Sequence, residues 1–524
     1  MNGIAVAPHA LAAQSAAAVL REGGNAIEAM VAAAACISVV YPHMNGIGGD
    51  AFWLVHEPGE APRAIDACGP TPAGLTADFY RSRGLDAIPV RGPLAANTVA
   101  GTIAGWDLAL AWSRERWGGK LPLARLLGDA IGFAQNGFEA TKSQEASTAA
   151  KLVELAQVPG FERRFLANGA VPAAGKTFLQ EPLAATLRRL ADAGLDDFYR
   201  GDLARSMASE LQAAGSPVTL DDLAAYRAQW KEPLSLAHSR GTLYNMTPPT
   251  QGVVSLMILG IAERIGIERL RDADYVHAMV EATKQAFTVR DRHVTDPRYM
   301  TVDPQSLLED GALAALARDI DMARARPWGK RSAPGDTVWM GTIDAHGRAV
   351  SFIQSIYHEF GSGIVLPSTG VNWQNRGCSF SLDPAALNCL KPGRKPFHTL
   401  NPALALLSDG RTMVYGTMGG DGQPQTQAAI FTRHVAHGLP LQESLSAPRW
   451  LLGRTWGSMS ESLKMESRFH AEVVAELKRR GHDVELVGEF DEVMGHAGAL
   501  VRHASGELEG AHDPRSDGGV ARSV

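Results

Sequence analysis

The chain has 524 residues, of which 45% are hydrophobic and 20% charged, and its formal net charge is −6. These values are ordinary for a globular protein, and the interspersed charges of both signs argue against nucleic acid as a partner. An apolar, alanine-rich run at residues 29–41 is too short to span a bilayer, which takes about 20 residues. We therefore expect no membrane partner and interpret this run as a buried helix.

Signals for cellular location and for metals are weak. Residues 1–14 lack a basic region followed by an apolar core and a cleavage site, which predicts a cytoplasmic protein. The cysteines show neither CxxC nor zinc-like spacing, so we expect free thiols at Cys36, Cys68, Cys378 and Cys389. The 16 histidines include no HExxH motif, and we predict neither a metal nor a cofactor.

The most informative stretch follows a polar segment, residues 324–336, which we expect to be an exposed loop. Thr337 opens an alternating run, VWMGTI, and a DAHG turn separates it from a second run, AVSFIQSI. This pattern predicts a β-hairpin, and a threonine that merely begins the hairpin is the simplest interpretation. A catalytic interpretation is also available. Cleavage of the Asp336–Thr337 bond would give Thr337 an α-amino group of pKa about 7.7–8.0 as its own base.

The stretch resembles the cleavage region of the γ-glutamyltransferase family, and it keeps Thr337, Asp344, Gly347, Val350, Phe360 and Gly361 at matching spacing. It departs from the family pattern at Val338, Trp339 and Tyr357. Five further segments resemble family segments in the same order: residues 23–55, 248–259, 277–299, 413–422 and 446–450. This resemblance therefore extends over most of the chain.

The resemblance implies an α+β fold, the four-layer αββα sandwich of N-terminal-nucleophile hydrolases. No linker or fixed-period repeat divides the chain, so we expect one interleaved domain. Autocatalytic cleavage would divide it into a large subunit, residues 1–336, and a small catalytic subunit, residues 337–524, which stay folded together. A homodimer is one assembly compatible with the sequence.

The resemblance also implies the catalytic residues. In the precursor the Thr337 hydroxyl would attack the carbonyl of Asp336, and after cleavage it would attack a substrate amide to form an acyl-enzyme. Ser355 matches a family hydroxyl that hydrogen-bonds the nucleophile, although polar residues also alternate on any half-buried strand. Gly419 and Gly420 match the glycine pair of the oxyanion hole, although GGDG is also an ordinary turn sequence.

The predicted substrate pocket departs from that of true γ-glutamyl enzymes. By position, the residues that replace the family's substrate-binding groups are Cys68, Tyr357, Arg376, Ser379, His398 and Thr399. Arg376 replaces an acceptor of the substrate's ammonium group, and its fixed positive charge would repel an ammonium ion and favour a carboxylate. A surface arginine is the alternative interpretation of Arg376. We therefore expect a small anionic amide as the substrate.

Four segments, at residues 355–363, 374–377, 396–403 and 418–425, resemble the oxamate amidohydrolase branch of the family. The sequence thus predicts an autocatalytically processed amidohydrolase that cleaves an oxamate-like amide. Three alternatives stay open: γ-glutamyl transfer or glutathione hydrolysis, acylase activity on larger amides, and an unprocessed relative that only binds a metabolite.

Overall fold

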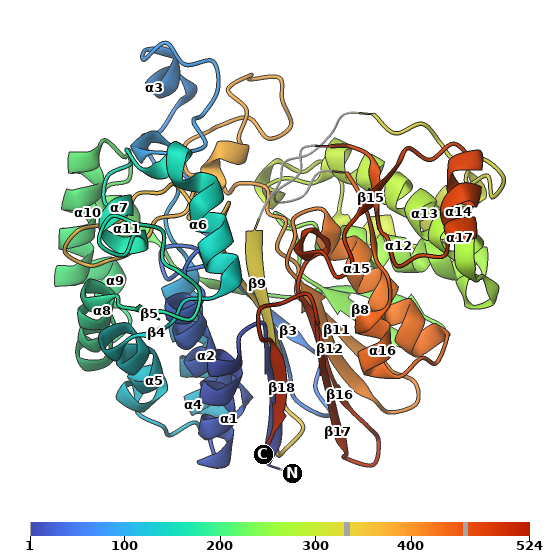
Figure 1. Cartoon of the computed structure of the whole chain (residues 1–524), viewed down its shortest axis with the longest axis horizontal. Coiled ribbons are helices and arrows are strands. Elements are labelled where there is room, and N and C mark those ends of the chain that lie inside the picture. The colour runs from blue at the N-terminus through green and yellow to red at the C-terminus, as the bar shows by residue number, and fades with distance from the viewer. Residues whose placement is uncertain (1, 330–335, 454–459) are drawn as a thin grey trace.

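Two antiparallel β-sheets lie face to face in the computed structural model, and helices cover the outer face of each sheet (Figure 1). The structure describes residues 2–329, 336–453 and 460–524. This arrangement confirms the predicted α+β class and the four-layer αββα sandwich. Residues 330–335 of the expected loop before Thr337 lie outside the described residues.

The first sheet has seven strands in the order β18-β1-β9-β10-β2-β3-β6. Their bounds are β1 (Gly3–Ala7), β2 (Asp50–His56), β3 (Arg63–Ala67), β6 (Gln229–Lys231), β9 (Asp336–Asp344), β10 (Ala349–Tyr357) and β18 (Val520–Ser523). The predicted hairpin is confirmed as β9 and β10. Its turn is closed by Asp344 Oδ1, which accepts the backbone N–H groups of His346 and Arg348 at 2.9 and 3.1 Å.

The second sheet has six strands in the order β17-β16-β12-β11-β8-β7. Their bounds are β7 (Leu234–His238), β8 (Gly241–Asn245), β11 (Ala403–Leu407), β12 (Thr412–Thr417), β16 (Ala497–Arg502) and β17 (Leu508–His512). Two smaller sheets contain β13 (Trp450–Leu452), β14 (Leu463–Glu466) and β15 (Val484–Val487), and β4 (Phe138–Glu139) with β5 (Thr177–Phe178).

Each large sheet carries its own group of helices. On the side of the first sheet lie α1 (Ala10–Arg21), α2 (Ala26–Val40), α3 (Ala77–Arg81), α4 (Thr102–Arg116), α5 (Leu123–Asn136), α6 (Lys142–Leu155), α7 (Phe161–Phe165), α8 (Glu181–Ala193), α9 (Asp197–Arg200), α10 (Asp202–Ala214) and α11 (Leu220–Ala225). On the side of the second sheet lie α12 (Gly252–Ile265), α13 (Asp272–His293), α14 (Asp310–Arg318), α15 (Gly422–Phe431), α16 (Leu441–Ser446) and α17 (Ala471–Arg479).

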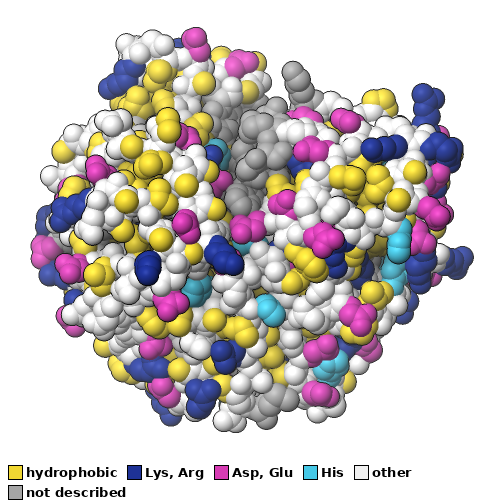
Figure 2. All heavy atoms as spheres, viewed as in Figure 1, with side chains coloured by type: hydrophobic (Ala, Val, Ile, Leu, Met, Phe, Trp, Pro, Cys, Tyr) yellow, Lys and Arg dark blue, Asp and Glu magenta, His cyan; other side chains and the backbone are white. Residues whose placement is uncertain are grey.

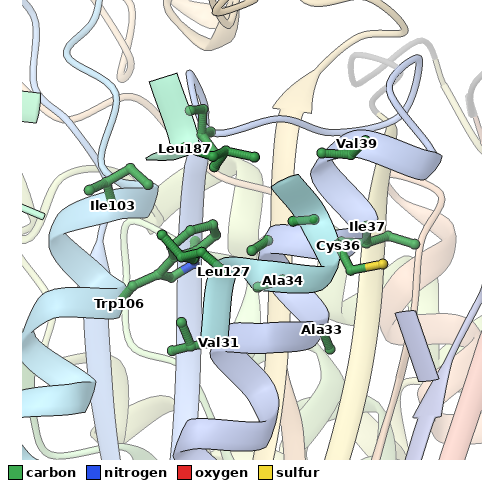
Figure 3. Close-up of a cluster of buried hydrophobic side chains, with 14 of the residues drawn as sticks. Val31, Ala33, Ala34, Cys36, Ile37, Val39, Ile103, Trp106, Leu127 and Leu187 are labelled. Atoms are coloured by element: carbon green, nitrogen blue, oxygen red, sulfur yellow. The ribbon is translucent and has the colours of Figure 1, made fainter. Parts of the chain in front are cut away.

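The alanine-rich run forms most of α2, and every residue of this helix is buried, which confirms the predicted buried helix. A capping box begins it, because the Asn25 side chain accepts the Glu28 N–H and the Glu28 carboxylate accepts the Asn25 N–H. Figure 3 shows Val31 and Ala34 of this helix in the cluster that also contains Trp106 and Leu127. Small side chains let neighbouring elements approach α2 from all sides.

The two sheets come into close contact where Trp339 packs on Gly416. A Cβ atom at Gly416 of β12 would lie only 2.2 Å from Trp339 Cδ1 of β9, so only glycine leaves room for this ring. Around it, Phe52, Ile353 and Val414 belong to the apolar cluster between the sheets. This contact fixes how β9 lies over β12.

The outer surface carries charges of both signs, intermixed over the face seen in Figure 2. None of the helices in the described parts of the chain is both long enough and apolar enough to cross a bilayer.

Candidate active site

Thr337 lies at the start of β9, next to an irregularity in the pairing of β9 with β10. Val338 pairs with Gln354, whereas Asp336 pairs with Tyr357, so two residues of β10, Ser355 and Ile356, face the single residue Thr337. This two-to-one arrangement is a β-bulge, which re-aims side chains near a strand end. Thr337 is buried and only 1% exposed.

Ser355 connects this point to the next strand of the sheet. It pairs with Asp50, the first residue of β2, and its Oγ accepts the backbone N–H of Tyr357 at 2.8 Å. Tyr357 has a φ of +81°, a strained conformation for a residue with a Cβ. The structure therefore places Asp50, Ser355 and Thr337 on three adjacent strands at the same end of the sheet.

The glycine pair lies at that same end of the sandwich. Trp339 packs on Gly416, and a Cβ at Gly341 would contact Val414 at 3.3 Å, so β9 and β12 run in opposite directions across the interface. Thr337 precedes Trp339 by two residues on β9, and Met418 follows Gly416 by two residues. Thr337 and Met418 therefore lie at the same level of the two sheets. Gly419 and Gly420 follow immediately with φ values of +109° and +52°, and α15 then begins at Gly422.

A buried ion pair supports this glycine loop. Arg290 Nη1 lies 2.7 Å from Asp421 Oδ1 and also donates to Gln251 Oε1 at 2.9 Å. Gln251 Nε2 in turn donates to the carbonyl of Gly420 at 2.9 Å. These three residues could not be predicted from the sequence, because they are distant in the chain and lack a local motif.

Asp50 is another buried residue of the site that was not predicted from the sequence. Its Oδ1 accepts the backbone N–H groups of Gly69 and Gly101 at 3.0 and 3.1 Å, and its Oδ2 lies 3.0 Å from His398 Nε2. Burial raises the pKa of Asp50 to about 7 and holds the pKa of His398 well below its usual range. The sequence does contain one indication of this role, because Asp50 directly follows Gly48 and Gly49 and begins an apolar strand.

Cys68 lies beside this pair. Its Sγ and the donor atoms of Asp50 and His398 all fall within 4.8 Å of one another, and burial raises the pKa of the Cys68 thiol. The described residues contain a second group of metal-type donors, His277, Glu281 and His482. Hydrogen bonds already use atoms of both groups, among them His277 Nδ1 with His482 Nε2 at 2.8 Å, so neither group requires an ion.

Arg376 is buried, which excludes the alternative of a surface arginine. It is 1% exposed, it stacks on the Tyr357 ring with Cζ 3.7 Å from the ring centroid, and Nη1 lies 3.5 Å from Thr399 Oγ1. Within the described part of the chain, its Nε and Nη2 have no hydrogen-bond partner. Burial lowers the pKa of Arg376, although the free base of a guanidinium stays rare in proteins.

A cavity of about 340 Å³ opens next to these groups. Three of the predicted substrate-binding residues, Tyr357, Ser379 and Thr399, line it. The cavity also reaches Asp421, and Leu387, Val294 and Phe397 give it an apolar wall. Arg376 stacks on the Tyr357 ring, whereas Cys68 and His398 lie close to Asp50. The structure thus brings the predicted residues into two neighbouring groups.

Comparisons with known proteins agree over the whole chain. A model of the gamma-glutamyltranspeptidase family matches residues 12–523. The chain is 60% identical over 520 residues to the oxamate amidohydrolase proenzyme of Klebsiella pneumoniae subsp. pneumoniae, with 99% of this chain and 98% of that protein covered. It is 29% identical over 542 residues to the glutathione hydrolase proenzyme of Escherichia coli, with 98% and 90% covered. A cephalosporin acylase structure from Bacillus halodurans matches with a TM-score of 0.89 and 32% identity, covering 100% of this chain and 96% of that one.

Proposed function

This chain belongs to the gamma-glutamyltranspeptidase family, and from that premise we propose an amidohydrolase that cuts itself and then hydrolyses a small anionic amide. The supporting observations are the buried Thr337 at the start of β9, the glycine pair that directly follows the level of Thr337 on β12, and the Nε and Nη2 atoms of Arg376, which have no hydrogen-bond partner among the described residues. An oxamate-like compound, which joins a carboxylate directly to a primary amide, is the proposed substrate.

Maturation is proposed to start within the uncut chain. Thr337 Oγ attacks the carbonyl carbon of Asp336, and the bond to the Thr337 nitrogen breaks, so that the acyl group moves from nitrogen to oxygen as an ester. Water then hydrolyses the ester, which leaves a carboxylate on Asp336 and a free α-amino group on Thr337. The antiparallel pairing of β1 with β9 and of β2 with β10 would hold the two segments, residues 1–336 and 337–524, together.

The mature enzyme uses the new α-amino group as the base. It accepts the proton of the Thr337 hydroxyl as the oxygen attacks the substrate amide, and it delivers a proton to the departing ammonia. Backbone N–H groups of Gly419 and Gly420 are proposed to stabilise the oxyanion, each contributing about 3–4 kcal/mol. Water then attacks the acyl ester and regenerates Thr337. Ser355, which faces Thr337 across the bulge, is proposed to orient its hydroxyl.

Substrate choice is proposed to depend on Arg376. A carboxylate accepts two parallel N–H bonds from a guanidinium, and Arg376 has both Nε and Nη2 available among the described residues. Ser379 Oγ is also buried without a hydrogen-bond partner in that part of the chain, and it lines the same cavity as Thr399. Together these groups suit a short acid and disfavour a substrate ammonium group. Tyr357 would form the lid over the guanidinium, whereas His398 and Cys68 would shape the far side through Asp50.

Intact mass under denaturing conditions tests the maturation step. We expect two pieces from the wild-type chain, the smaller beginning at Thr337, and one uncut chain from Thr337→Ala. A panel of oxamate, glutathione and a γ-glutamyl anilide then tests the substrate, with ammonia or amine release as the readout. A single stable chain in both proteins would refute the mechanism, whereas cleavage with activity only on γ-glutamyl compounds would refute the substrate.

An acylase acting on larger amides is the second candidate. The apolar wall of Val294, Leu387 and Phe397 would accept a longer acyl chain than that of oxamate. A series of primary amides with the same carboxylate and a growing carbon chain separates the two functions. The acylase interpretation requires kcat/KM to rise with chain length, whereas the oxamate-like interpretation requires it to fall.

A further inference from the structure

A second polar cavity, of about 310 Å³, lies on the helical side of the six-stranded sheet. Its wall is built from the start of α13, the π-helical turn Thr432–Ala436 that directly continues α15, and the segment that leads into α17. The lining of the cavity includes Arg271, Asp272, Tyr275, Arg433, Arg468 and Phe469. None of them belongs to the candidate active site.

The wall of this cavity is strongly cationic. Three arginines, Arg271, Arg433 and Arg468, stand against one carboxylate, that of Asp272. Both Arg271 and Asp272 are exposed at the rim, whereas Arg433 is only 6% exposed. An unbalanced cluster of this kind attracts anions, because each guanidinium presents a fork of N–H donors.

Arg433 is the group that most needs a partner. Its Nη2 donates to the carbonyl of Pro448 at 2.6 Å, but Nη1 is buried and has no hydrogen-bond partner within the described residues. The Cζ atom lies 5.4 Å from the Trp450 ring centroid and 6.0 Å from that of Tyr275. The aromatic faces and the Tyr275 hydroxyl partly compensate the buried cation, but Nη1 itself has no acceptor within the described residues.

The nearest buried carboxylates are already engaged by other arginines. Glu466 pairs with Arg515 at 2.6 Å and with Arg468 at 3.4 Å. Asp513 pairs with Arg515 at 3.0 Å and also with Arg449. Three arginines, Arg449, Arg468 and Arg515, therefore share two carboxylates in this region. No ion pair to Arg433 occurs in the described ranges, and Glu466, which acts on its charge from a distance, is already paired with Arg515 and Arg468.

We propose that this cavity binds a small organic anion, whose phosphate or carboxylate head is held by Arg433 and Arg468 and whose apolar body packs on Tyr275 and Phe469. The buried, unpartnered Nη1 supplies a donor whose desolvation has already occurred in the folded protein. A cavity of about 310 Å³ has room for a head group together with one ring. Short π-helical turns frequently occur at functional sites, and this turn presents Arg433.

Calorimetric titration tests this site with two probes, inorganic phosphate and phenyl phosphate, at constant ionic strength. We expect saturable binding of both, with phenyl phosphate binding more tightly because its ring reaches Tyr275 and Phe469. Arg433→Met should weaken both at least about tenfold, the size of a lost charge-assisted contact. A matched control, Arg269→Met, removes a side chain that is 86% exposed and should bind as the wild type does.

Two further variants keep the test decisive. Arg376→Met should leave phosphate binding unchanged, because the proposed anion site is not the active site. If Arg433→Met fails to fold, Arg468→Gln should still weaken binding several-fold. A titration with benzoate in the Arg376→Met background, which lacks the carboxylate site proposed above, distinguishes the two head groups, since preferential binding of benzoate or of phenyl phosphate there assigns the carboxylate or the phosphate. No saturable binding of any probe, or unchanged binding in both Arg433→Met and Arg468→Gln, would overturn the proposal.

Discussion

Replacing Arg290 with Met is expected to destabilise the protein by about 3–5 kcal/mol, the cost of removing one partner of a buried ion pair. Arg290 is 2% exposed and Asp421 is 1% exposed, so removing the guanidinium takes away the cation that contacts a buried carboxylate at 2.7 Å. The change also removes the donor to Gln251 Oε1, and the same Gln251 side chain donates to the Gly420 carbonyl at 2.9 Å. Amide hydrolysis should therefore fall more steeply than the stability loss alone would cause.

Urea unfolding measures the first effect, in chains that also carry Thr337→Ala so that the proposed cleavage cannot separate the two segments. The control is Arg292→Met on the same helix, an exposed position where surface substitutions stay within about 0.5 kcal/mol. Arg290→Met combined with Asp421→Asn should cost less than the sum of the two single changes, because the pair is coupled. A cost below about 1 kcal/mol for Arg290→Met, or strict additivity, would refute this account of the loop.

Three further predictions concern packing and pH. Gly416→Ala should cost about 1–3 kcal/mol in urea unfolding, because its Cβ would meet the Trp339 ring at 2.2 Å. Gly128→Ala, which has open space, should instead stabilise α5 by about 0.5–1 kcal/mol; equal effects would contradict the packing argument. Burial raises the pKa of Asp50 to about 7, above the unfolded value of about 3.9. The free energy of unfolding should therefore fall as pH rises from about 4 to 7. Asp50→Asn should remove this part of the pH dependence. Burial lowers the pKa of His482 to about 3, below the unfolded value of about 6.5. The stability that the neutral imidazole contributes should therefore be lost as pH falls from about 6.5 to 3. If His482→Gln left the dependence of stability on acid pH unchanged, this prediction would be wrong.

The sequence predicted those features whose signal is local. Alternation of apolar residues gave β9 and β10, and the DAHG turn between them needs Gly347, whose φ is +78°. The alanine-rich run gave α2 because its residues are small on every face. The order of the layers came from resemblance to a family, since neither composition nor periodicity specifies which strands become neighbours in a sheet.

Contacts between distant parts of the chain could not be predicted in this way. The Asp50–His398 contact joins residues 348 positions apart, and the Arg290–Asp421 contact joins residues 131 apart. Each residue looks ordinary in its own segment: an acid at a strand start, or an arginine near the end of a helix. Their importance arises only from burial, because a charge without water must find its partner inside the protein.

Arg376 shows how the structure adds to what its position in the sequence indicated. A surface arginine would lie in water and would carry no information about a ligand. Buried against Tyr357 with two nitrogens lacking partners in the described ranges, its side chain makes the empty protein less stable than one with a satisfied group. Binding of a carboxylate would supply the missing acceptors, and the stabilisation gained would appear as affinity. A γ-glutamyl ammonium group at the same point would add a second buried positive charge. The expected specificity therefore follows from the sign of one buried charge.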